Sequence, residues 1–306
     1  PSFEIIVLDD QSSDTTPAIL SNIASANPRL RVLTGKPLPA GWTGKNWACY
    51  QLARHAKGDF FLFTDADTIF HPHALSCLVS TIVSLKADLL TGFPKQVMNS
   101  WRERLIIPFF SWAFFSFTPL FLAYRLKLPL LSSAVGQMLL FRRAAYETIG
   151  GHQSVRGHIA EDLSLVRRVK AAGMIWRITY LTDLISCQMY TGSRQAFSGF
   201  SKNFFAAFDF RLLPYLFVFT WLAVMFWHPL IILILNLLGL VQSADPAALA
   251  ANICLSLLLW AIPYQRLGFG IWPALFYPVT LMIVEAIALN SLFQSLTGQL
   301  SWKGRR

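Results

Sequence analysis

Charged residues are scarce in this 306-residue chain. They make up 14% of the sequence, whereas hydrophobic residues make up 54% and the mean hydropathy is +0.47. Because a typical soluble domain has about 25% charged residues, the composition disfavours a disordered chain, a collagen-like fibre and an ordinary soluble enzyme. The sequence predicts a membrane-associated protein.

Cysteine is also scarce, with four residues far apart in the sequence and no Cys-x-x-Cys pair: Cys49, Cys77, Cys187 and Cys254. This spacing indicates neither a zinc site nor a disulfide framework. We expect reduced intracellular thiols.

Acidic residues are outnumbered by basic ones, which gives a net charge of +10 and a pI near 9.7. No basic run interleaves with aromatic residues in a pattern typical of nucleic-acid binding, so no nucleic-acid partner is expected. Basic residues beside apolar runs suit the anionic cytoplasmic leaflet of a membrane. Charged residues are few after Leu212, where we find only Asp245, Arg266, Glu285, Lys303, Arg305 and Arg306. We therefore expect the polar chemistry to lie before Leu212.

The first half of the chain alternates predicted strands and helices. Strand-like runs cover residues 3–8 and 59–64, and predicted helices follow them over residues 16–26 and 72–83. A repeated strand–helix unit predicts an α/β fold with a mostly parallel sheet.

Acidic residues follow both predicted strands. Asp9 and Asp10 come after the first strand, and Asp65 and Asp67 after the second. The carboxyl ends of parallel strands meet at one edge of the sheet, where open α/β folds bind ligands. Carboxylates gathered at that edge repel one another unless a cation offsets their charge. Oxygen ligands suit Mg²⁺ or Mn²⁺. The alternative is a pair of solvated loops without function.

A third acidic pair, Glu161 and Asp162, begins a predicted amphipathic helix that ends at Gly173. The free N–H groups and the dipole of a helix start favour ionised carboxylates. The alternative is that these two acids only cap the helix.

Together these motifs resemble those of the family 2 glycosyltransferases, which have the GT-A fold. Residues 7–14 are similar to the family's nucleotide-binding strand end, and Asp65-Ala66-Asp67 to its metal-binding DxD motif. Gly150-Gly151 followed by Glu161-Asp162 resembles the acceptor-side loop and ED motif. The resemblance covers residues 3–173 and implies a GT-A (Rossmann-like) nucleotide-sugar-binding domain. We expect the family's first strand to be missing from this sequence.

Within the family, the chain is similar to membrane-bound enzymes that glycosylate lipids, particularly the carotenoid- and hopanoid-associated branch. Residues 38–48 and 302–305 carry this narrower resemblance. Processive members have a Q/R-x-x-R-W motif after the ED pair, whereas residues 194–203 contain no Arg-Trp. A processive polysaccharide synthase is therefore a less favoured alternative, and a catalytically inactive membrane scaffold of the same fold is another.

The resemblance implies inverting transfer of a sugar from a nucleotide diphosphate sugar, with a uridine diphosphate (UDP) sugar as the expected donor, to a lipid hydroxyl. It implies that Asp67 binds the metal directly and that Asp65 bridges to the metal or to the ribose. Asp162 is the expected general base, with Glu161 as its neighbour or positioner.

The nucleotide is expected to contact Asp9, Asp10, Lys45 and Asp65. A lysine ammonium is a hydrated point charge suited to phosphate. An ordinary surface position is the alternative for Lys45.

Four apolar segments stand out. We predict that residues 105–124 lie in the membrane interface, with an internal core helix pair as the alternative. Residues 212–241, 249–264 and 271–296 are expected to lie in the membrane. The predicted domains are accordingly a catalytic domain over residues 1–211 and a transmembrane region over residues 212–306.

Basic residues before and after the last three segments are expected on the cytoplasmic side of the cell (inner) membrane, with the catalytic domain facing the cytoplasm. Equal sidedness requires an even number of crossings. Either the first segment is a hairpin or one segment does not cross, and we favour four crossings over two. Glu285, inside the last segment, is expected to pair with a polar neighbour or to face a cavity.

Overall fold

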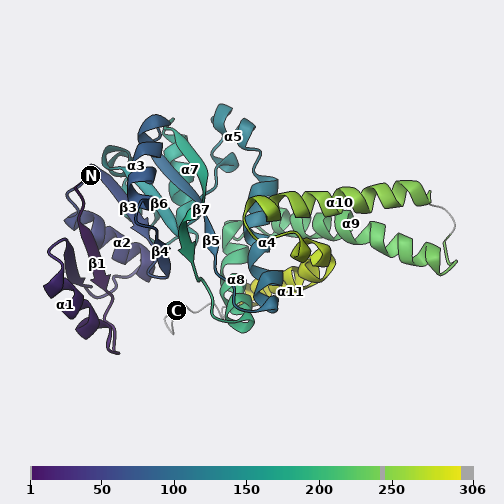
Figure 1. Cartoon of the computed structure of the whole chain (residues 1–306), viewed down its shortest axis with the longest axis horizontal. Helices are drawn as coiled ribbons and strands as arrows, with labels where there is room; N and C mark the ends of the chain where they lie inside the picture. The colour runs from purple at the N-terminus through teal and green to yellow at the C-terminus, as the bar shows by residue number, and fades with distance from the viewer. Residues whose placement is uncertain (1, 242–244, 298–306) are drawn as a thin grey trace. The chain divides into compact units, whose positions relative to one another are not determined.

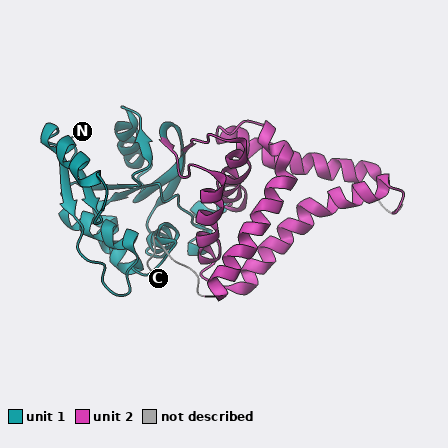
Figure 2. Cartoon of the chain, turned by 90° about the horizontal axis from the view of Figure 1, so that it is seen from below, with its two compact units in different colours: residues 1–94, 120–185 teal, residues 95–119, 186–306 magenta. Residues whose placement is uncertain are grey.

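The computed structural model describes residues 2–241 and 245–297 (Figure 1). The chain forms two compact units, the first from residues 1–94 and 120–185 and the second from residues 95–119 and 186–306 (Figure 2). The predicted domain boundary at residue 211 does not coincide with this division. The difference arises because residues 95–119 and 186–211 pack with the apolar C-terminal helices rather than with the α/β unit.

The first unit contains a two-stranded sheet and most of a five-stranded sheet. The parallel pair is β1 (Ile5–Asp9) and β2 (Leu30–Thr34). The larger sheet has the order β3-β6-β5-β7-β4. Its strands are β3 (Phe60–Thr64), β4 (Thr68–Phe70), β5 (Leu89–Gln96), β6 (Met138–Arg142) and β7 (Trp176–Cys187).

The predicted α/β class is confirmed, but the larger sheet is mixed. Strand β6 lies between β3 and β5 and runs antiparallel to both. The prediction of a mostly parallel sheet rested on two strand–helix units, neither of which contains β6, and β6 runs in the reverse direction.

Helices surround the sheets of the first unit. They are α1 (Thr16–Ala26), α2 (Gly44–His55), α3 (Ala74–Ser84), α5 (Leu120–Arg125), α6 (Arg143–Thr148) and α7 (Glu161–Ala171), with 3₁₀ turns η1 (Pro129–Leu131) and η2 (Gly151–Val155). The predicted helix starting at Glu161 is confirmed, and Gly173 follows it with φ +75°, the left-handed conformation that glycine tolerates at a helix end.

Strand β6 is buried on both faces, which explains its apolar sequence. Leu139 and Phe141 pack in a cluster with residues of α7, whereas Met138 and Leu140 pack in a second cluster with residues of α3. Because strand side chains alternate between faces, β6 joins the two halves of the core.

The second unit is helical. It contains α4 (Trp101–Phe117), α8 (Ser193–Ala207), α9 (Leu212–Leu237), α10 (Pro246–Arg266), η3 (Trp272–Phe276) and α11 (Tyr277–Leu296). Within residues 2–241 and 245–297, three segments are long and apolar enough to cross a membrane, namely Leu212–Leu237, Pro246–Arg266 and Trp272–Leu296, with mean hydropathies of 2.2, 1.7 and 1.6. These helices indicate a membrane protein.

The first apolar block is one continuous helix, α9, with Pro229 inside it. Figure 1 shows α9 and α10 running side by side. The hairpin that would give four crossings is therefore wrong for this block. His228-Pro229 does not end the helix, because the surrounding residues are strongly apolar and continue it on both sides.

Helix α4 is packed inside the second unit. Its start is capped by Ser100, whose hydroxyl accepts the Glu103 N–H at 3.3 Å. Further along, the Trp112 indole N–H donates to the Leu259 carbonyl at 2.9 Å, and its ring stacks on Trp260 with 4.0 Å between centroids. Residues 105–124 are thus not one element, since α4 ends at Phe117 and α5 belongs to the first unit.

Candidate active site

The amino-terminal turn of α2 carries the centre of the candidate site. The Lys45 ammonium lies 2.9 Å from an Asp65 carboxylate oxygen and 2.8 Å from a Glu161 carboxylate oxygen. The Lys45 and Asp65 side chains are about one-third exposed, whereas the Glu161 side chain is 8% exposed. The DxD-like turn after β3 and the start of α7 therefore meet at one lysine.

A buried asparagine fixes α2 against the segment that leads into α7. The Asn46 side-chain amide donates to the carbonyls of Val155, Arg156 and His158 at 2.8, 3.1 and 3.0 Å. The Thr43 N–H also donates to the Arg156 carbonyl at 2.8 Å. Asn46 is fully buried, so these bonds form away from competing water and set the place of Lys45 relative to the start of α7.

Asp162 lies in the first turn of α7, where two backbone groups orient it. Its carboxylate accepts the Leu163 N–H at 2.8 Å and also the Gly136 N–H. A Cβ added at Gly136 would lie 3.0 Å from the carboxylate, so the close approach needs glycine here. Burial raises the pKa of Asp162 to about 7, and the charge of Glu161 adds to the rise, whereas Lys45 opposes it.

Two opposing effects act on the pKa of Lys45. Burial disfavours its ammonium, but the attraction of Glu161 and then of Asp65 exceeds that cost and holds the pKa of Lys45 well above its usual range. One turn along α2, burial raises the pKa of the Cys49 thiol to about 12. Lys45 is therefore a permanent cation, and Cys49 is not a nucleophile at neutral pH.

Asp10 also reaches this region, whereas Asp9 is engaged locally. A Cβ built at Gly44 would lie 3.9 Å from an Asp10 carboxylate oxygen, so the exposed Asp10 side chain lies beside the start of α2. The Asp9 carboxylate accepts the Ser12 N–H at 3.1 Å within its own loop. The two neighbouring acids are thus placed differently.

Asp67 lies exposed in the turn between β3 and β4. In the same turn, the Thr68 hydroxyl donates to the Asp65 carbonyl at 2.6 Å. Among residues 2–241 and 245–297, no group of three or more His, Cys, Asp or Glu side chains is arranged to hold a metal. Mg²⁺ is usually held by one or two carboxylates together with substrate phosphates, and Asp67 with Asp65 suits that smaller set.

A buried histidine behind the site was not predicted from the sequence. A His152 ring nitrogen lies 2.8 Å from the Tyr146 hydroxyl, and burial, with the charge of Lys45, lowers the pKa of His152 to about 3. Gly151 has φ +48°, and a Cβ there would overlap the Tyr146 ring. The Gly150-Gly151 pair, which the resemblance assigned to the acceptor-side loop, thus helps to pack a neutral imidazole against the site.

Comparison with known sequences adds to this geometry. Residues 1–150 match the sequence model of the family described as "Glycosyl transferase family 2". This part of the chain includes β1, the DxD-like turn and β6, and the match supports a glycosyltransferase.

Several solved structures are similar to this chain at low sequence identity. Mannosyltransferase PcManGT from Pyrobaculum calidifontis, in complex with GDP-Man and Mn²⁺, is 16% identical with a TM-score of 0.50, and the match covers 96% of this chain and 77% of that one. A mycobacterial protein is 18% identical (TM-score 0.43; 67% and 64% covered), and S. aureus TarS is 17% identical (TM-score 0.41; 66% and 34% covered). The chain thus spans less than two thirds of the last two proteins.

Proposed function

We propose that this protein transfers a sugar from a nucleotide diphosphate sugar, with a UDP sugar as the donor, to the hydroxyl of a lipid, with inversion. The observation that carries the proposal is Lys45, which contacts both Asp65 and Glu161. The donor-side and acceptor-side motifs therefore share one site, as a transfer reaction requires.

On the donor side, Asp10 and Lys45 contact the nucleotide and its phosphates. Asp9 shapes the loop that follows β1. A diphosphate that approaches Lys45 competes with Asp65 for the ammonium, which frees that carboxylate for the ribose or a metal. Asp67, with Asp65, would hold Mg²⁺ or Mn²⁺, and PcManGT is a similar structure that contains Mn²⁺. When bound, the metal offsets the charge of the departing diphosphate.

On the acceptor side, Asp162 takes the proton of the attacking hydroxyl. The hydroxyl oxygen bonds to the anomeric carbon from the face opposite the diphosphate, the bond from that carbon to the diphosphate oxygen breaks, and Asp162 receives the proton. The N–H groups of Gly136 and Leu163 hold the carboxylate in place, and the raised pKa of Asp162 makes it a better base than an ordinary carboxylate.

The acceptor is a membrane lipid of the carotenoid or hopanoid kind, and the active site faces the cytoplasm at the inner membrane. The three long apolar segments of the second unit support a membrane substrate. Residues 105–117, in α4, would contribute to the interface with lipid.

The test is an assay of membranes that contain the full chain, incubated with labelled UDP sugars and GDP sugars, with Mn²⁺, with Mg²⁺ or with a chelator. We expect a labelled glycolipid, identified by mass spectrometry, that forms only with a divalent metal. Glu147→Gln, which alters a surface ion pair with Arg143, is a matched control and should transfer normally. A labelled polymer, or no labelled lipid with any donor, would overturn the proposal.

A further inference from the structure

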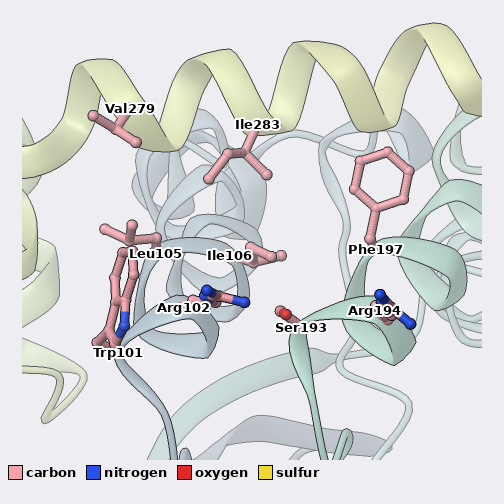
Figure 3. Close-up of a pocket in the computed structure, with 9 residues that line it drawn as sticks. All are labelled: Trp101, Arg102, Leu105, Ile106, Ser193, Arg194, Phe197, Val279 and Ile283. Carbon is pink, nitrogen blue, oxygen red and sulfur yellow. The ribbon is translucent and has the colours of Figure 1, made fainter.

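The second unit contains a cavity of about 370 Å³ between α4, α8 and α11 (Figure 3). Pockets that hold small ligands usually have volumes of about 300–1,000 Å³. All the residues that line it belong to the second unit. The cavity therefore has the size of a ligand site and uses none of the residues assigned to catalysis, nucleotide binding or metal binding.

One side of the cavity is apolar. Val279 and Ile283 lie on consecutive turns of α11, and Leu105 and Ile106 face the same space from α4 (Figure 3). These side chains lie in the helical unit that contains the three candidate membrane spans. Such a wall suits a hydrocarbon chain, because it offers no hydrogen-bonding groups.

The other side of the cavity is basic. Arg102 and Arg194, with Ser193 between them, lie opposite α11 in Figure 3. In the described part of the chain, neither arginine forms an ion pair with a carboxylate. Both lie in the first turn of a helix, α4 or α8, where the helix dipole also favours an anion. Arginine presents a planar set of donors that matches phosphate.

We propose that this cavity binds an anionic phospholipid of the bilayer. The lipid phosphate contacts Arg102 and Arg194, and one hydrocarbon chain lies along Ile106 and Ile283. The charge of the two unpaired arginines selects the anionic headgroup, and the apolar wall selects a lipid over a free anion. This site goes beyond the proposed transfer reaction and holds whether or not that proposal is right.

The test measures lipid retained by the purified full chain in detergent, by native mass spectrometry, after addition of phosphatidylglycerol or of phosphatidylcholine with the same chains. We expect phosphatidylglycerol to bind preferentially. Arg102→Ala and Arg194→Ala should each reduce that preference about fivefold, since a basic residue near a membrane surface contributes about that much. Arg266→Ala, at the end of α10 and outside the cavity, is the matched control and should leave the preference unchanged.

Three further measurements separate the possible occupants. Inorganic phosphate in large excess should not displace phosphatidylglycerol if the hydrocarbon chain of the lipid is bound. Val279→Trp, which fills the apolar side of the cavity, should weaken phosphatidylglycerol binding. The thermal unfolding temperature of this variant should stay near that of the native protein. Arg102→Lys with Arg194→Lys, which keeps both charges, should retain most of the preference. Equal retention of both lipids, a native preference in both Arg102→Ala and Arg194→Ala, or displacement by phosphate would each overturn the proposal.

Discussion

The Lys45 ammonium lies between the carboxylates of Asp65 and Glu161. These two residues are 96 positions apart in the sequence and belong to different motifs. Without the ammonium these carboxylates face each other uncompensated, and like charges at close range disfavour the ionised forms. The residue thus links the two motifs electrostatically as well as geometrically.

Replacing Lys45 with methionine keeps the length of the side chain and removes its charge. We expect kcat/KM for sugar transfer to fall by about 10²-fold, the loss typical of removing one preorganised charge-stabilising donor. Steady-state transfer assays measure this, with the exposed Lys57→Met as the matched control. Native activity in Lys45→Met would show that the lysine is an ordinary surface residue.

Replacing Asp162 with asparagine should lower turnover by about 10²- to 10⁴-fold, the usual contribution of a general base.

The same replacement of Asp162 with asparagine should raise the free energy of unfolding at pH 8. The pKa of Asp162 is about 7 in the folded chain and about 3.9 when unfolded. The native state therefore binds more protons between these values, and the free energy of unfolding falls as pH rises through that window.

Thermal unfolding of native protein and Asp162→Asn at pH 5 and pH 8 checks the second part. The asparagine variant should gain stability relative to native protein at pH 8 and gain less at pH 5. A variant that is less stable at pH 8, or that transfers sugar at the native rate, contradicts the assignment of Asp162 as a buried base.

At the scale of elements, α2 and α7 are held together by Asn46 and the carbonyls of residues 155–158. Helix α7 then presents Glu161 and Asp162 from its first turn. Asn46 acts on the reaction by positioning these groups, not by touching the substrate.

Asn46→Ala should cost about 1–3 kcal/mol of stability, because it leaves buried carbonyls without donors, and should lower kcat more than it raises KM. Asn46→Asp keeps the size of the side chain but replaces its donors with a carboxylate facing three carbonyls, so we expect it to be at least as harmful. Asn27→Ala, which removes a cap in an exposed turn, is the control. Equal kcat in Asn46→Ala and native protein would refute the positioning role.

Local elements were largely predictable from the sequence, and long-range pairing was not. Capping and apolar spacing gave the start of α7 at Glu161, and the apolar run gave β3. The direction of β6 was not predictable, because alternation and burial do not specify which way a strand runs. Asn46 and His152 were missed for a related reason, since their partners depend on how distant segments pack.

At the scale of the whole molecule, three segments qualify as membrane spans, and the first apolar block is a single helix. If the basic residues before α9 and after α11 lie on the same side of the membrane, one of the three segments does not cross. The described residues do not include the basic residues after α11, namely Lys303, Arg305 and Arg306. Nor do they include the segment 302–305 that carried part of the narrower resemblance. If the two sets of basic residues share a side, two crossings are expected in place of the four that the sequence favoured.

The central claim is that separated acidic motifs and Lys45 form one site for a metal-bound nucleoside diphosphate. Calorimetric titration of the purified full chain with UDP and with GDP, each with and without Mn²⁺, tests it most directly. The account predicts that one of them binds with Mn²⁺ and binds at least about tenfold more weakly without it, a difference of about 1.4 kcal/mol. In the presence of Mn²⁺, Asp67→Asn should bind the nucleotide at least about tenfold more weakly than the native protein does. No binding of either nucleotide, or equal binding in native protein and Asp67→Asn, would contradict the account.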